Sequence, residues 1–158
     1  MKAKLTAKLL TLLGFSAVAS SCEETMKCMY GTPSASYVFN THVKDVETGE
    51  AIKGIRVSLL ERHTRIDNAT QEKTEFVDTL ATGKTNSQGQ VVLRHGGMPL
   101  PYNKAEFAAD DIDGSENGEY NPTNVEITIN SNEYVDDNDS IWDQGKVTKD
   151  ITLKLHKK

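Results

Sequence analysis

The sequence predicts an all-β protein, a seven-stranded antiparallel β-sandwich preceded by an N-terminal export signal. Several short segments alternate apolar and polar residues, which is typical of strands with one buried face. Glycine, asparagine, aspartate and proline separate these segments and supply turn chemistry. No segment shows the apolar period of an amphipathic helix, so we expect two packed sheets.

The strands are predicted from their alternation. They span residues 37–43, 55–59, 76–82, 91–94, 104–112, 124–129 and 147–155. Residues 61–75 are polar and without period, so we expect a long loop there, and residues 133–144 form an acidic surface loop. Lys149 interrupts the alternation of the last strand, where valine would suit better. The residues expected between the sheets are Phe39, Val57, Leu59, Val91, Leu93, Phe107, Ile127, Ile129, Ile151 and Leu153.

Two motifs specify the type of sandwich. One is Thr48-Gly49-Glu50-Ala51-Ile52-Lys53-Gly54-Ile55-Arg56-Val57, and the other is Lys84-Thr85-Asn86-Ser87-Gln88-Gly89-Gln90-Val91. They resemble the acidic turn, the glycine step into a strand and the later hairpin of the carboxypeptidase regulatory-like, transthyretin-type sandwich. The resemblance implies that fold for residues 36–158.

The first residues form an export signal. Lys2, Lys4 and Lys8 precede a short apolar run at residues 9–18, and small residues lead to Cys22. The run is shorter than the roughly 20 residues of a membrane-spanning helix. The pattern resembles a bacterial lipoprotein signal. That resemblance implies cleavage of residues 1–21, diacylation of Cys22, a lipidated tether at residues 22–35 and a bilayer as partner. The alternative is ordinary cleavage that leaves Cys22 free.

The net charge of the chain and its predicted location limit the classes of partner that it can bind. Removing residues 1–21 takes three of the 18 basic residues and none of the 23 acidic ones, so the formal charge falls from −5 to −8. An acidic chain argues against nucleic acid, because binding phosphates needs Lys and Arg. Glu23 and Glu24 resemble the acidic residues that favour surface export in Bacteroidetes lipoproteins. We therefore expect the bacterial cell envelope, at the outer membrane and exposed at the surface.

Cys28 begins the segment Cys28-Met29-Tyr30-Gly31-Thr32-Pro33. With the signal and the sandwich motifs, this segment resembles the radical SAM-associated lipoprotein family of Bacteroidetes. The resemblance implies a radical SAM protein as a partner and a modification at or near Cys28. The alternative is that the segment only leads the tether into the first strand, with Tyr30 packing on the sandwich.

The acidic loop of residues 110–119 is a calcium candidate. Aligned with an EF-hand loop that starts at Asp111, Asp113 falls on a ligand position. However, Glu116 replaces the required glycine and Pro122 replaces the bidentate glutamate, so the loop is not an EF-hand. A second acidic loop at residues 136–139 could complete a site. The alternative, which we favour, is two solvated turns and no metal.

Catalytic motifs are missing from the sequence. It contains neither a Gly-x-Ser-x-Gly elbow nor a His-Glu-x-x-His helix. We therefore expect a non-enzymatic display or binding module, without a cofactor, whose ligand is a protein or a glycan. Trp142, in an acidic loop, is the candidate ligand-stacking residue, with packing on the sandwich as its alternative. Ser140, in Asp139-Ser140-Ile141, resembles a Bacteroidetes O-glycosylation site, as does Thr79 in Asp78-Thr79-Leu80.

Overall fold

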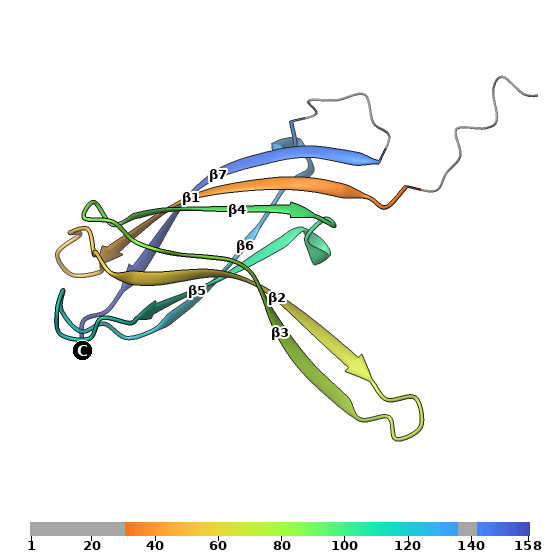
Figure 1. The fold of residues 1–158 in the computed structure, drawn as a ribbon, viewed down its shortest axis with the longest axis horizontal. Helices are drawn as coiled ribbons and strands as arrows, with labels where there is room; N and C mark the ends of the chain where they lie inside the picture. The colour runs from red at the N-terminus through yellow and green to blue at the C-terminus, as the bar shows by residue number, and fades with distance from the viewer. Residues whose placement is uncertain (1–30, 136–141) are drawn as a thin grey trace, which may run out of the picture. The chain divides into compact units, whose positions relative to one another are not determined.

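The computed structural model describes residues 31–135 and 142–158, which form an all-β sandwich of two sheets (Figure 1). One sheet has the strand order β4-β1-β7 and the other β3-β2-β5-β6, so the predicted seven-stranded sandwich is confirmed. Among the described residues, no helix has the length and apolarity that crossing a bilayer requires. The elements are β1 (Ser34–Asp45), β2 (Ile55–Ile66), β3 (Lys73–Lys84), β4 (Gln90–Gly97), η1 (Pro101–Asn103), β5 (Lys104–Asp111), β6 (Thr123–Thr128), η2 (Ser131–Glu133) and β7 (Asp143–Leu155).

The prediction that all strands pair antiparallel is wrong for one pair. β1 runs antiparallel to β4 but parallel to β7, where Phe39 lies opposite Lys149 and Val43 opposite Leu153. The pairs of the four-stranded sheet are all antiparallel. An alternating pattern shows which face of a strand is buried, but it does not show the direction of the neighbouring strand. The crossover from β6 to β7, between the two sheets, sets that direction.

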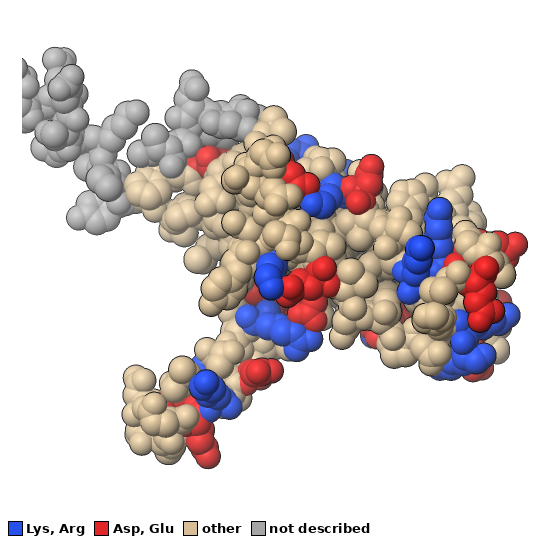
Figure 2. All heavy atoms as spheres, turned by 180° about the vertical axis from the view of Figure 1, so that it is seen from behind, with Lys and Arg blue, Asp and Glu red and all other residues tan. Residues whose placement is uncertain are grey.

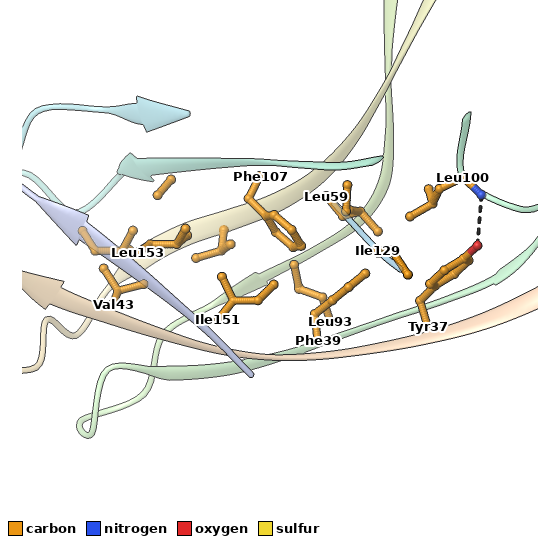
Figure 3. Packing of buried hydrophobic residues seen from close by; sticks show 14 of the residues in the cluster. Tyr37, Phe39, Val43, Leu59, Leu93, Leu100, Phe107, Ile129, Ile151 and Leu153 are labelled. Carbon is orange, nitrogen blue, oxygen red and sulfur yellow. Dashed lines mark hydrogen bonds between the residues drawn. The ribbon is translucent and has the colours of Figure 1, made fainter. Parts of the chain in front are cut away.

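The core lies between the inner faces of the two sheets (Figure 3). Phe39 on β1 meets Phe107 on β5 edge to face, with ring centroids 5.1 Å apart at 85°. Val91 and Ile127 are half-buried, because β4 and β6 are the edge strands of their sheets. The other predicted core residues are buried: Phe39, Val57, Leu59, Leu93, Phe107, Ile129, Ile151 and Leu153.

The long loop predicted at residues 61–75 is wrong. β2 and β3 continue as a paired ribbon as far as Ile66 opposite Lys73, and this ribbon extends away from the two sheets (Figure 1). The pairing shifts between Leu59 and Leu60, so Leu80 is an extra residue on β3. Such a β-bulge bends and twists a strand, and it lies where the ribbon leaves the sandwich. A ribbon without a buried face needs no alternating pattern, which is why the sequence did not reveal it.

Lys149 lies on the inner-facing row of β7, and its charge is satisfied at the edge of the sandwich. Its Nζ is 2.6 and 2.9 Å from the two carboxylate oxygens of Glu133, and it donates to the carbonyl of Thr128 at 3.1 Å. Two hydrogen bonds lower the pKa of Glu133: the larger effect comes from the Lys149 side chain and the smaller from the backbone N–H of Asn130. A long apolar stem lets lysine occupy such a position. The residue that breaks the alternation therefore ties β7 to the chain around η2.

The two sequence motifs meet at Thr85. Its hydroxyl accepts the N–H of Ile55 at 3.0 Å and donates to the carbonyl of Ile52 at 2.8 Å. Its carbonyl accepts the N–H of Gly54 at 3.1 Å. Gly89 supports the same junction, because a Cβ there would lie 2.6 Å from the carbonyl oxygen of Val43. The motifs therefore encode the junction between β1, β2 and the β3–β4 hairpin.

Candidate functional site

The residues predicted for modification lie outside the described ranges. This applies to Cys22 and Cys28 near the N-terminus and to Ser140 in the loop before β7. Their predicted lipidation, radical SAM-dependent modification and glycosylation stay predictions. Thr79, the weaker glycosylation candidate, is exposed on β3.

Trp142 lies directly before β7 and is half-buried rather than exposed. Its carbonyl accepts the N–H of Ser34 at 2.8 Å, which joins the beginnings of β1 and β7. The structure therefore places Trp142 at one end of the three-stranded sheet, with its side chain partly buried.

The carboxylate of Asp111 holds the acidic loop together. It accepts the N–H of Tyr120 at 2.9 Å through one oxygen and the N–H of Asp113 at 3.3 Å through the other. Burial raises the pKa of Asp111, but these backbone N–H donors outweigh that effect, so the pKa ends below its ordinary value. Both oxygens are thus engaged with the loop's own backbone, which is the role of a turn residue.

Asp113 packs directly over Gly54. A Cβ on Gly54 would lie 1.7 Å from Oδ2 of Asp113, and Gly54 has a φ of +89°. The same oxygen accepts the Asn117 side-chain N–H at 2.7 Å and lies 3.8 Å from Nζ of Lys84. The other oxygen, Oδ1, is buried without a protein partner. Asp113 therefore holds the acidic loop against Gly54, which directly precedes β2.

The projecting part of β2 and β3, here called the arm, comprises residues 61–79. Residues opposite each other in an antiparallel pair share a face. One face therefore carries Arg62 with Val77, and the other carries His63 with Phe76. Phe76, Val77 and Ile66 are 45, 46 and 49% exposed, so both faces present apolar surface to solvent. This is unusual for a strand pair, which normally buries one face.

His63 lies between two carboxylates on the face of the arm that carries Phe76. Its Nε2 is 3.4 Å from Oε2 of Glu61 and 3.4 Å from Oδ2 of Asp78. The three side chains do not amount to a metal site. Over residues 31–135 and 142–158, no group of three or more His, Cys, Asp or Glu side chains is arranged to hold a metal ion.

A hollow of about 220 Å³ opens at the base of the arm, on the outer face of the four-stranded sheet. Two ion pairs line it. Nε and Nη2 of Arg62 each donate to a carboxylate oxygen of Glu106 at 2.6 Å, and Nζ of Lys104 donates to Glu126 at 2.7 Å. The paired bonds lower the pKa of Glu106 and raise that of Arg62. Figure 2 shows positive and negative side chains gathered together where the arm leaves the sheet.

Tyr102, in η1, forms part of the rim of this hollow and is 91% exposed. It has φ 54° and ψ 18°, and Asn103 has φ 55°. The left-handed region costs a residue with a Cβ about 1–2 kcal/mol, and tyrosine lacks the short polar side chain that helps asparagine there. Asn103 is held by the rest of the chain, because its N–H donates to Leu100 at 3.2 Å and its carbonyl accepts from Ile129 at 2.8 Å.

Sequence reasoning missed both the arm and Tyr102. Residue type alone favours Trp142 as the ligand-stacking residue, whereas Tyr102 is a much more exposed aromatic side chain that lies beside a hollow. The sequence contains one indication that Tyr102 is exposed. Tyr102 and Asn103 follow Pro99 and Pro101 between two predicted strands, which indicates a turn whose side chains face solvent.

Comparison with known proteins gives similarities of structure only. No family model and no curated protein matches the sequence. The 5-hydroxyisourate hydrolase of Klebsiella pneumoniae is 18% identical over 77% of this chain and 91% of its own, with a TM-score of 0.41. The C-terminal domain of a shaft pilin of Lactobacillus rhamnosus GG is 12% identical over 78% and 98%, with a TM-score of 0.37. A minor pilin of Streptococcus agalactiae is 16% identical over 80% and 46%, with a TM-score of 0.36.

Similarities at this level transfer no activity and no mode of assembly to this chain. Its own strand order and pairing define it as a seven-stranded β-sandwich protein with a projecting β-ribbon.

Proposed function

We propose that this chain is a non-enzymatic binding module, anchored to a bacterial membrane through Cys22, that uses the arm to contact its ligand. The arm is the observation that carries the proposal. It orders about twenty residues outside the core, and ordering backbone costs roughly 1–2 kcal/mol per residue. Isolated two-stranded ribbons are marginally stable, so a projecting ribbon with exposed apolar side chains indicates a contact surface.

The arm also has open edges. β2 pairs with β5 only as far as Leu60, and β3 is the edge strand of its sheet. Open edges usually carry proline, bulges or inward-pointing charges that prevent pairing with other chains. The arm contains no proline, and its edge strand carries the charged residues Lys73, Glu75 and Asp78. No proline therefore removes a backbone N–H from this edge, and the bulge at Leu80 lies where the arm leaves the sandwich.

The anchoring part of the proposal rests on the signal pattern before Cys22. The absence of turnover rests on the sequence, which lacks the catalytic motifs named above. The acidic charge of the chain favours a neutral or basic ligand over an anionic one.

Site-specific photo-crosslinking in the native host tests the use of the arm. A benzophenone amino acid replaces Phe76 on the arm in one strain and Val92 on β4 in another. The two positions are 45 and 50% exposed, so they are matched for access. We expect a discrete crosslinked product from position 76 and none from position 92. Equal patterns from both positions would remove the arm from the proposal.

A further inference from the structure

We propose that the hollow at the base of the arm is a binding site for a neutral saccharide, with Tyr102 as the residue that stacks on a sugar ring. This inference rests on the proposed binding function and names its ligand class. Three observations carry it: the backbone conformation of Tyr102, the rigid support beneath it, and the chemistry of the hollow.

The backbone conformation indicates that Tyr102 is present for a reason other than folding. Its φ of 54° suits glycine or asparagine, and tyrosine is strained there. A strained residue normally gains packing in return, but Tyr102 is 91% exposed. Backbone strain without packing is found at ligand-binding positions.

The turn that holds Tyr102 is fixed to the core on both sides. Before it, the N–H of Leu100 donates to the hydroxyl of Tyr37 at 3.0 Å, a bond drawn in Figure 3. After it, the carbonyl of Asn103 accepts the N–H of Ile129. The side-chain oxygen of Asn103 accepts the hydroxyl of Tyr134 at 3.4 Å. The aromatic ring therefore extends from a rigid base, which lowers the entropy lost when a ligand stacks on it.

The charges of the hollow disfavour an anionic ligand, and its polar groups suit a hydroxyl-rich one. The cations Arg62 and Lys104 are each paired with a glutamate of the same hollow, and Glu61 adds one further carboxylate. No net positive charge remains to attract an anion. The paired carboxylates keep free lone pairs that accept from hydroxyls, and the guanidinium of Arg62 keeps N–H groups that donate to them. Polar groups of both kinds beside an exposed aromatic face fit a sugar ring.

The test uses three forms of the full chain, namely wild type, Tyr102→Gly and Tyr102→Phe, on an array of neutral, sialylated and sulfated glycans. The best neutral binder is then titrated as a free oligosaccharide by NMR. We expect Tyr102→Gly to weaken binding about tenfold or more, which corresponds to about 1.4 kcal/mol. Tyr102→Phe keeps the ring and should bind within about threefold of wild type. Thermal melting is measured in parallel, and Tyr102→Gly should raise Tm by about 2–4 °C because it relieves the strained conformation.

A loss of binding together with an unchanged or higher Tm supports the inference, because unfolding cannot explain it. The inference is overturned if wild type binds no glycan, if only acidic glycans bind, or if Tyr102→Gly binds as well as wild type. A discrete crosslink from position 76 alongside any of these results would leave the arm in place and remove only the saccharide site.

Discussion

Replacing the buried Gly54 by alanine should destabilise the chain, because the carboxylate of Asp113 occupies the space that a side chain needs. A Cβ on Gly54 would lie 1.7 Å from Oδ2 of Asp113 and 2.7 Å from its Cγ. The φ of +89° adds about 1–2 kcal/mol for any residue with a Cβ. Moving the carboxylate breaks its bond to Asn117, which is worth about 1 kcal/mol. The expected total loss of unfolding free energy is about 2–3 kcal/mol.

Urea unfolding followed by circular dichroism measures this loss, with Gly49→Ala as the matched control. Gly49 has φ +72°, and a Cβ added to it would meet nothing within 4 Å, so alanine there should show the conformational penalty alone. In an Asp113→Ala background, Gly54→Ala should cost no more than Gly49→Ala does in wild type, since the clash and the bond to Asn117 are both already absent. If Gly54→Ala is no less stable than Gly49→Ala, Asp113 does not pack over Gly54 as described.

Three further outcomes are expected. Thr41 is buried and its hydroxyl has no protein partner, so Thr41→Val should raise the unfolding free energy by about 1 kcal/mol in urea titrations; a loss would mean that the hydroxyl is satisfied. Because the pKa of Asp111 lies below its ordinary value of 3.8, its stabilising effect is present above that value and is lost as the pH falls through the lower folded value. The Tm of wild type should therefore fall more steeply than that of Asp111→Asn as the pH drops below about 4, and parallel decreases in Tm would contradict this. Cys22→Ala should move the protein out of the membrane fraction of its host, and continued membrane partition would refute lipid anchoring.

The two glycine-containing motifs show how sequence can specify local structure. Gly54, Thr85 and Gly89 belong to the sandwich pattern in the sequence, and the structure shows them meeting at one junction. Lys149 is a second example. Its position in an apolar row is an irregularity visible in the sequence. Only the fold shows that its Nζ bonds to the carboxylate of Glu133 and the carbonyl of Thr128.

The acidic loop shows the opposite case. Carboxylates at alternate positions around a glycine look the same in the sequence whether they face solvent, a cation or the protein. The structure directs Asp111 to backbone N–H groups and Asp113 to Gly54. The contact with Gly54 depends on a segment far earlier in the chain, which no local pattern could show.

The sequence by itself determined the fold class, most of the strand positions and the inner faces of the strands, because burying one face of a strand imposes a two-residue period. It also contains the signal that predicts anchoring at Cys22. The tertiary structure alone decided the parallel pairing of β1 with β7, the arm and the exposure of Tyr102. None of these leaves a period in the sequence, because strand direction is set by a crossover, the arm has no buried face, and the conformation of Tyr102 is held by contacts distant in the chain.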